Sequence, residues 1–416
     1  MSTRILLVGV IASSHQRGEK MEALEELAAL TRTSGGEVVE RLIQVRPKLD
    51  PATLIGNGKA LEIREICHQY DIQLVIFDDQ LSATQLRNLE EIIGVRVIDR
   101  TAVILDIFAI HARTAEAKVQ VELAQLEYIK TRLTGLGIAM SRLGGGIGTR
   151  GPGETKLEVD RRRIEQRITT LRRQLKRIEQ ERAIQRKRRN DVIQLTLAGY
   201  TNAGKSSLFN RLTNSQVKVS ERLFATLDAS TRVLSGHRGV PIVLTDTVGF
   251  IRNLPPQLVA SFRSTLAEIK YADLIIHVAD VSDAMVERKI DVVNETLQSI
   301  GVEGKPIILT LNKIDRVFDD LRLTRLKALY PDAIFISAVT GAGIDNLLNR
   351  IAAFIDSQLV VRTFTVPQER WDLVSIILSA GEVLNEVEID GNRCLKVKGL
   401  PAELARLRKQ INAALK

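Results

Sequence analysis

The feature that most constrains the fold is a glycine-bounded segment made of Gly199, Tyr200, Thr201, Asn202, Ala203, Gly204, Lys205 and Ser206. It fits the pattern G-x-x-x-x-G-K-[ST], in which main-chain N–H groups surround the phosphates of a nucleotide. Alternating apolar residues predict a strand over 192–197, and residues 207–212 predict the start of a helix. A strand, a glycine loop and a helix N-terminus are the three parts that such an anion site needs. A chance glycine turn is the competing interpretation, and these flanks disfavour it.

Two further segments supply the residues expected around the phosphates. In a loop of this type Lys205 reaches the β- and γ-phosphates and the hydroxyl of Ser206 binds Mg²⁺. Asp246 ends a predicted strand over 242–245, where its carboxylate is placed to hold Mg²⁺ through water. It is followed by Thr247, Val248 and Gly249. We expect the N–H of Gly249 to meet the γ-phosphate, and we count Lys205 and Gly249 among the catalytic residues.

Two later strands end in residues suited to a guanine base. The strand predicted over 307–311 leads into Asn312, Lys313, Ile314 and Asp315. The carboxylate of Asp315 can accept hydrogen bonds from N1–H and N2–H₂ of guanine, and adenine offers no such donors. The strand predicted over 334–336 leads to Ser337, Ala338 and Val339, where a backbone N–H can meet the guanine O6. All these strings in order, each at a strand end, predict a GTP site.

Together these motifs resemble those of the translation-factor-like P-loop GTPases. Two segments make the resemblance more specific, the glycine-rich residues 148–155 and the run Phe224, Ala225, Thr226, Leu227 and Asp228. They resemble the HflX family of ribosome-associated GTPases, and the resemblance covers essentially the whole chain. It implies that residues 224–228 bind nucleotide and that Thr226 is the switch threonine, a catalytic residue whose hydroxyl completes the Mg²⁺ shell. The family pattern continues with Pro-Thr, where this chain has Ala229 and Ser230.

Two positions bear on how GTP is hydrolysed. Phe250 follows Gly249, where Ras-like enzymes carry a glutamine that orients the attacking water. Phenylalanine cannot orient water by hydrogen bonding, so we expect slow intrinsic hydrolysis. A role limited to packing the switch is the alternative for Phe250. Asn202 lies where some related GTPases bind a stimulating K⁺, although such an asparagine more often only hydrogen-bonds the loop.

The pattern of elements predicts a multidomain α/β protein. An N-terminal α/β domain is expected over 1–112, a basic helical hairpin with a glycine-rich loop over 113–190, a Ras-like GTPase domain with a mixed sheet over 191–357, and a small α+β domain over 358–416. In the first domain, runs of strand and helix type alternate and predict a mostly parallel sheet. Strands are expected over 5–10, 38–45, 74–77 and 96–98, and helices over 19–31, 61–70 and 83–93.

The hairpin holds most of the charge. The net charge is +9, and residues 154–190 hold fourteen Lys or Arg against six Asp or Glu. Helices are expected over 114–133 and 154–189, and the second has a heptad seam and a length of about 50 Å. Because basic residues lie largely off the seam, we expect contact with structured RNA; a merely solvated face is the alternative. The glycine-rich residues 144–153, with Arg150, form the expected tip.

Several smaller expectations complete the sequence-based view. Residues 56–59 could hold an anion, although a plain turn is the more common role. Trp371 is expected in a core, Cys67 and Cys394 are expected to be buried thiols, and no zinc site is expected. The chain starts without a signal peptide and has no membrane-spanning run, which favours a cytoplasmic protein.

The resemblance implies a protein that binds GTP or GDP with Mg²⁺, associates with the large ribosomal subunit and its RNA, and splits stalled or idle ribosomes under stress. A monomer is expected. A GTPase that assembles or modifies another RNA or protein complex is the alternative. A weaker third possibility is a second nucleotide site in the first domain.

Overall fold

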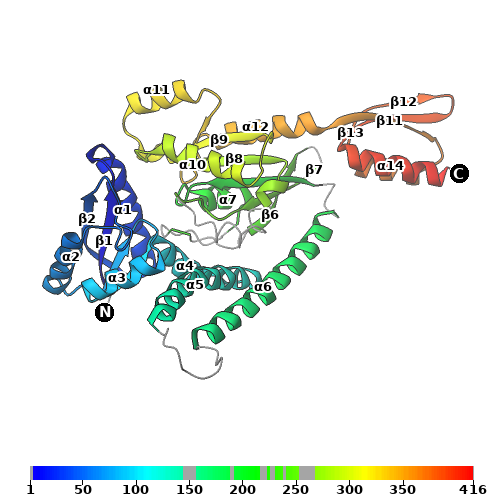
Figure 1. The fold of residues 1–416 in the computed structure, drawn as a ribbon. Coiled ribbons are helices and arrows are strands. Elements are labelled where there is room, and N and C mark those ends of the chain that lie inside the picture. The colour runs from blue at the N-terminus through cyan, green and yellow to red at the C-terminus, as the bar shows by residue number, and fades with distance from the viewer. Residues whose placement is uncertain are drawn as a thin grey trace. The chain divides into compact units, whose positions relative to one another are not determined.

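The structure is a computed structural model that describes residues 3–143, 156–187, 192–215, 223–224, 230–237, 240–252 and 268–415. These residues form two compact units (Figure 1). The first contains the described residues up to Ile178 together with Leu223 and Phe224, and the second contains the others. The four domain boundaries expected from the sequence stay a prediction.

A four-stranded parallel sheet in the order β2-β1-β3-β4 forms the centre of the first unit. Strand β1 is buried along nearly its whole length, as a continuous apolar run in a parallel sheet should be. The strands are β1 (Arg4–Ile11), β2 (Glu37–Val45), β3 (Leu74–Phe77) and β4 (Arg96–Asp99). The helices around them are η1 (Ser14–Gln16), α1 (Arg17–Thr33), α2 (Asn57–Gln69), α3 (Ala83–Ile93) and α4 (Arg100–His111). The predicted α/β fold with a mostly parallel sheet is confirmed.

Helix α4 is absent from the sequence-based expectations. Val103, Ile104, Ile107 and Phe108 form its buried face, and apolar residues continue on the other side as Ala102, Ala109 and Ile110. A helix that is apolar on most sides shows no amphipathic period, and its β-branched residues are equally typical of a strand. For these two reasons the segment gives no clear helical signal.

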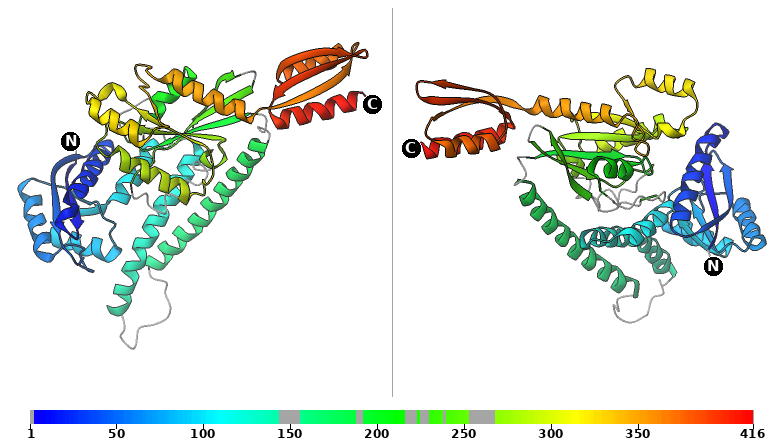
Figure 2. Two further views of the ribbon diagram at one scale, coloured as in Figure 1. Left: turned by 90° about the horizontal axis from the view of Figure 1, so that it is seen from above. Right: turned by 180° about the vertical axis from the view of Figure 1, so that it is seen from behind.

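Helices α5 (Ala115–Leu143) and α6 (Lys156–Lys187) form the predicted hairpin (Figures 1 and 2). Leu123 of α5 packs with Ile168 and Leu171 of α6, which lie on the predicted seam. Helix α5 extends to Leu143 rather than ending near residue 133. The glycines in this stretch cost about 1 kcal/mol each relative to alanine, which a long helix can tolerate.

A six-stranded sheet in the order β10-β9-β8-β5-β7-β6 forms the core of the second unit. All neighbours are parallel except β6 and β7, so the predicted mixed sheet is confirmed. The strands are β5 (Ile193–Gly199), β6 (Ser230–His237), β7 (Val240–Asp246), β8 (Leu274–Asp280), β9 (Ile307–Asn312) and β10 (Ile334–Phe335). The helices are α7 (Lys205–Thr213), α10 (Val286–Ser299), η2 (Ile314–Arg316), α11 (Asp320–Leu329) and α12 (Ile344–Gln358).

The last elements form the predicted α+β arrangement, with an antiparallel sheet in the order β11-β13-β12. They are β11 (Val360–Pro367), α13 (Trp371–Ser379), β12 (Glu382–Ile389), β13 (Asn392–Gly399) and α14 (Pro401–Ala414). Figure 2 shows α14 beside this sheet. Side chains of β11, β13, α13 and α14 share one core, which includes Phe364, Leu395 and Leu407.

Two expectations about buried residues are wrong. Trp371 is 61% exposed, and its ring stacks on the guanidinium of Arg393, whose Cζ lies 3.6 Å from the ring centroid. Trp371 is the first residue of helix α13, so its side chain lies at the end of the helix rather than on the buried face. Cys394 is only half-buried, because it alternates with Leu395 and points to the other side of the sheet. Cys67 is buried as expected.

In the described part of the chain, no helix is both long enough and apolar enough to cross a membrane.

Candidate functional site

The predicted phosphate loop joins the end of strand β5 to the start of helix α7. Two glycines in it are required by geometry. Gly199 has φ +154°, and a Cβ there would lie 2.1 Å from the carbonyl oxygen of Val278. Gly204 has φ +90°, and a Cβ there would lie 2.2 Å from Nδ2 of Asn312. The loop therefore fits closely against the ends of strands β8 and β9.

Lys205 lies inside this loop and is almost completely buried. Its Nζ donates hydrogen bonds to the carbonyl oxygens of Gly199 (3.1 Å) and Tyr200 (2.8 Å). Burial lowers the pKa of the Lys205 amine to about 8, while the charge of Asp246 opposes this shift. The ammonium is thus desolvated, which strengthens its attraction for an anion that enters the loop.

Ser206 of helix α7 and Asp246 of strand β7 are brought together in the site. The Ser206 hydroxyl donates to Oδ2 of Asp246 at 2.7 Å, and Asp246 is fully buried at the end of β7. The next residue, Thr247, donates from its hydroxyl to the carbonyl oxygen of Leu197 at 2.7 Å, which holds the start of this loop against β5. A hydroxyl and a carboxylate at this distance form a pair of hard oxygen donors.

The loop after β7 pairs directly with the phosphate loop. The N–H of Phe250 donates to the carbonyl of Gly199 (3.0 Å), and the N–H of Thr201 donates to the carbonyl of Phe250 (2.8 Å). A Cβ on Gly249 would lie 2.8 Å from the Cα of Thr201 and 3.0 Å from Nζ of Lys205. Gly249 therefore lies beside the lysine, as its predicted γ-phosphate role requires. Val248 and Phe250 are both buried, and burial of Phe250 favours a packing role.

Asn312 connects three parts of the site. Its Nδ2 donates to the carbonyl of Ala203 at 2.9 Å, and its Oδ1 accepts from the N–H of Ala338 at 3.0 Å. One amide thus fixes the phosphate loop against the predicted base-binding segments. Lys313 forms an ion pair with Asp280 at 2.7 Å and adopts a left-handed conformation with φ +69°.

The remaining base-site candidates lie next to Asn312 in the structure. Asp315 is exposed in η2, directly after Ile314. Ser337 is fully buried, and its hydroxyl accepts from the N–H of Thr340 at 3.0 Å. Val339 is largely exposed. The side chains of Asp315 and Val339 are thus accessible, while Ser337 shapes the turn.

Part of the predicted site lies outside the described residues. These residues are Ala225, Thr226, Leu227 and Asp228, together with the glycine-rich segment 144–153, and their roles stay predictions. Phe224 is described and buried in the first unit against Phe108, with ring centroids 4.6 Å apart. Asn202 is exposed in the loop with φ +60°.

The hairpin carries both paired and exposed cations. Arg167 of α6 pairs with Glu122 at 2.6 Å, and Arg172 pairs with Glu127 at 2.8 Å. These two arginines are partly neutralised by α5. A second group, Arg173, Lys176 and Arg177, is exposed on α6 and forms no ion pair with other described residues.

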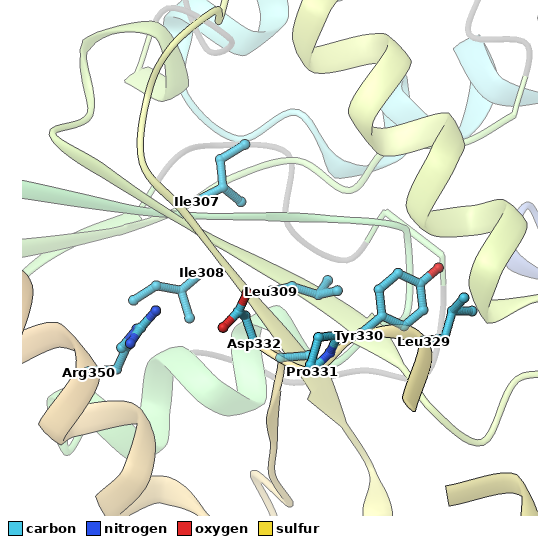
Figure 3. A pocket seen from close by; sticks show the side chains of 9 residues that line it. Ile307, Ile308, Leu309, Leu329, Tyr330, Pro331, Asp332 and Arg350 are labelled. Atoms are coloured by element: carbon cyan, nitrogen blue, oxygen red, sulfur yellow. The ribbon is translucent and has the colours of Figure 1, made fainter. Parts of the chain in front are cut away.

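A cavity of about 240 Å³ lies at the opposite end of β9 from Asn312. Its lining mixes the aliphatic start of β9 with Tyr330, Asp332 and Arg350 (Figure 3). Because β9 runs from Ile307 to Asn312, this cavity is separate from the nucleotide site.

Four family models match successive parts of the chain. They are described as GTP-binding GTPase N-terminal (residues 21–109), GTP-binding GTPase Middle Region (111–189), 50S ribosome-binding GTPase (194–313) and HflX C-terminal domain (324–414). A GTPase HflX from Lacrimispora saccharolytica is 44% identical over 385 residues, which cover 92% of this chain and 90% of that protein. The chain belongs to the HflX family of GTPases.

Other HflX relatives agree. GTPase HflX from Escherichia coli (strain K12) is 41% identical over 394 residues, which cover 94% of this chain and 92% of that protein. Among solved structures, a GTP-binding protein from Sulfolobus solfataricus in complex with GDP shares 27% identity, with a TM-score of 0.43, over 85% of this chain and 98% of that one. As an HflX-family member the chain binds and hydrolyses GTP, as its motifs predict.

Sequence reasoning missed two features of this site. Tyr200 was assigned only a main-chain role, yet its hydroxyl accepts from the N–H of Arg252 at 2.8 Å and so holds the segment after Phe250. The base-site role of Asn312 stays a prediction, and the sequence did not indicate that its amide joins Ala203 and Ala338. Neither link carries a local sequence signal, because both depend on residues that are distant along the chain.

Proposed function

We propose that this chain is a GTP-controlled switch that docks on the large ribosomal subunit and separates idle or stalled ribosomes under stress. Two observations support it. The segment 194–313 matches a family model described as 50S ribosome-binding GTPase. The exposed cations of α6 give the chain a surface suited to the phosphates of structured RNA. We further propose that it acts as a cytoplasmic monomer.

We propose the following roles at the phosphates. Lys205 contacts the β- and γ-phosphates, and the N–H of Gly249 contacts the γ-phosphate. Mg²⁺ fits the donor set because Ser206 and Asp246 offer only hard oxygen atoms, and Thr226 would complete that set when GTP is bound. When bound, Mg²⁺ neutralises charge that develops on the phosphate oxygens. Asn202 is the candidate for a K⁺-dependent contribution.

The guanine base is proposed to lie against the residues that follow β9 and β10. The exposed carboxylate of Asp315 accepts from the guanine edge, and a backbone N–H of the segment 337–339 donates to O6. The observation that carries the GTPase part of the proposal is the Asn312 amide, which bonds to Ala203 and Ala338 at once. It fixes the distance between the phosphate and base sites, so a nucleotide finds both already positioned.

The test combines association with turnover. The full chain bound to a non-hydrolysable GTP analogue should pellet with purified large subunits at moderate salt, and the GDP form should pellet less. GTP turnover should rise when large subunits are added, because Phe250 provides no hydrogen bond to the attacking water. Absence of both effects would rule out the ribosomal role, and stimulation by a different RNA or protein complex would favour an assembly or modification GTPase.

A further inference from the structure

The two described residues before the predicted switch threonine are held by the first unit. The N–H of Leu223 donates to the Thr33 hydroxyl at 3.3 Å, and Thr33 in turn donates to Ala29 within α1. The ring of Phe224 meets the ring of Phe108 edge-on, at a centroid distance of 4.6 Å and an interplanar angle of 72°. Leu223 and Phe224 are both buried. A short segment of the GTPase sequence is therefore anchored on helices α1 and α4.

The anchor holds an unfavourable backbone conformation. Phe224 has φ +57°, in the left-handed region that bulky residues rarely adopt. Such a conformation persists where packing over-determines it. The aromatic contact with Phe108 is the packing that the structure shows at this point.

Helix α4, which carries Phe108, is tied at its N-terminal end to neighbouring elements of the first unit. It begins after Asp99, and the carboxylate of Asp99 accepts from the N–H of Ala102 at 3.2 Å. The next side chain, Arg100, is buried and pairs with Glu26 at 2.5 Å and with Asp78 at 3.0 Å. The start of α4 is thus bound to α1 and to the end of β3.

Asp99 also binds helix α5, the first helix of the hairpin. Its fully buried carboxylate accepts from the hydroxyl of Tyr128 at 2.8 Å and from the guanidinium of Arg132 at 2.6 Å. The Arg132 guanidinium stacks on the Tyr128 ring, with Cζ 3.2 Å from the centroid. One carboxylate therefore joins the start of α4 to the middle of α5.

Very little chain separates the anchored Phe224 from the predicted switch threonine. Thr226 follows Phe224 by two residues, and two residues of extended chain span only about 7 Å. With so short a connection, a displacement of Thr226 when GTP recruits it is passed to Phe224, where it loads the Phe224–Phe108 contact and, through that contact, α4. We propose that the contact holds and that α4 is the coupling element between the nucleotide site and the hairpin. The inference rests on the proposed function in taking Thr226 as the residue that GTP recruits.

Coupling of this kind is reciprocal, so an RNA partner that fixes the hairpin also changes the affinity for GTP. The effect of GTP on α4 and the hairpin can be measured by hydrogen–deuterium exchange on the full chain, without any ribosome. In the wild type, amides of residues 100–132 should exchange differently in the GDP form and in the form bound to a non-hydrolysable GTP analogue. Phe108→Leu removes the aromatic contact near the C-terminal end of α4. Tyr128→Phe removes the α5 hydroxyl that bonds to Asp99 at the start of α4. Both variants should lose most of the difference between the two nucleotide forms.

The effect of the RNA partner on the nucleotide site is measured as the affinity for the GTP analogue with and without large subunits. If the sites are coupled, large subunits should change the affinity for the GTP analogue by about fivefold or more. In both variants the ratio of the affinities with and without subunits should fall toward one. Ile110→Ala is the matched control, because Ile110 lies on α4 with its side chain exposed, and it should behave as the wild type.

The outcomes separate the inference from the proposed function. If the wild type pellets with large subunits but its exchange over 100–132 is the same in both nucleotide forms, the coupling is refuted and the function stands. If it does not pellet, the ribosomal role fails, and the exchange measurement still decides the coupling. The inference is also overturned if either variant keeps the wild-type difference, or if Ile110→Ala loses it as well. Should Phe108→Leu fail to fold, Tyr128→Phe alone decides.

Discussion

At the scale of single residues, most of the site could be predicted because each motif is local. The glycines, the lysine and the serine of the phosphate loop are required by the loop itself, and the strand ends carrying Asp246 and Asn312 follow from short apolar runs. The link from Asn312 to Ala203 spans 109 positions, so no local pattern could reveal it. The exposure of Trp371 was missed for a similar reason, because its contact with Arg393 forms across the fold.

One residue-scale prediction tests the base assignment. Asp315→Asn exchanges a carboxylate that accepts two hydrogen bonds for an amide that can donate one. We expect affinity for GTP to fall at least about 100-fold, because hydrogen bonds to charged groups contribute about 1.5–3 kcal/mol each. Affinity for xanthosine triphosphate, whose base carries a carbonyl at C2, should rise. Competition binding with both nucleotides measures the exchange, and an unchanged preference for GTP would remove Asp315 from the base site.

A second residue-scale prediction concerns His277 on strand β8. Burial lowers the pKa of this imidazole to about 4, the nearby charge of Lys205 adds to the shift, and a hydrogen bond with Asn294 opposes it. The folded chain therefore binds fewer protons than the unfolded chain between pH 6.5 and 4. The free energy of unfolding should fall as the pH decreases through this window, by up to about 3 kcal/mol from this residue.

The measurement is urea unfolding of the wild type and of His277→Gln at several pH values between 7 and 4.5. The variant lacks the titrating ring, so its stability should depend less steeply on pH over this window, whatever its stability at neutral pH. Parallel curves for the two proteins would show that His277 does not titrate as its burial implies.

At the scale of elements, the hairpin shows which charges remain available. Arg167 and Arg172 are exposed but pair with glutamates of α5, whereas Arg173, Lys176 and Arg177 are exposed and form no ion pair with the described residues. Composition alone counts all of these cations equally. Only the packing of α5 against α6 distinguishes the cations that pair with glutamates from Arg173, Lys176 and Arg177, so the sequence could predict a basic helix but not which of its charges are already paired.

The prediction for this element is a change in salt dependence. Replacing Arg173, Lys176 and Arg177 with glutamine should weaken association with large subunits and reduce the slope of log K against log salt by up to about three, roughly one per lost phosphate contact. The same exchange at Arg406, Arg408 and Lys409 of α14 alters the net charge equally and should leave the slope unchanged. Pelleting at several salt concentrations gives both slopes. A wild-type slope in the α6 variant would show that these side chains do not contact phosphates.

At the scale of the whole molecule, the fold class follows from the order of strands and helices, and the three sheets match it. Helix α4 is the main element that the sequence-based expectations lack, since a helix with apolar residues on all sides gives no periodic signal. The position of Phe224 beside Phe108 was equally out of reach. The motif predicts that Phe224 belongs to a nucleotide-binding segment. A motif indicates what a segment binds but not which other element of the fold it packs against.

The carboxylate of Asp99 has a practical consequence for anyone who exchanges parts between homologues. It receives hydrogen bonds from Leu81, Ala102, Tyr128 and Arg132, which belong to separate segments of the chain. A graft that imports a foreign hairpin without matching partners for this acid would bury an uncompensated negative charge, at a cost of several kcal/mol. Chimaeras should therefore be cut so that the acid, the tyrosine and the arginine come from the same parent.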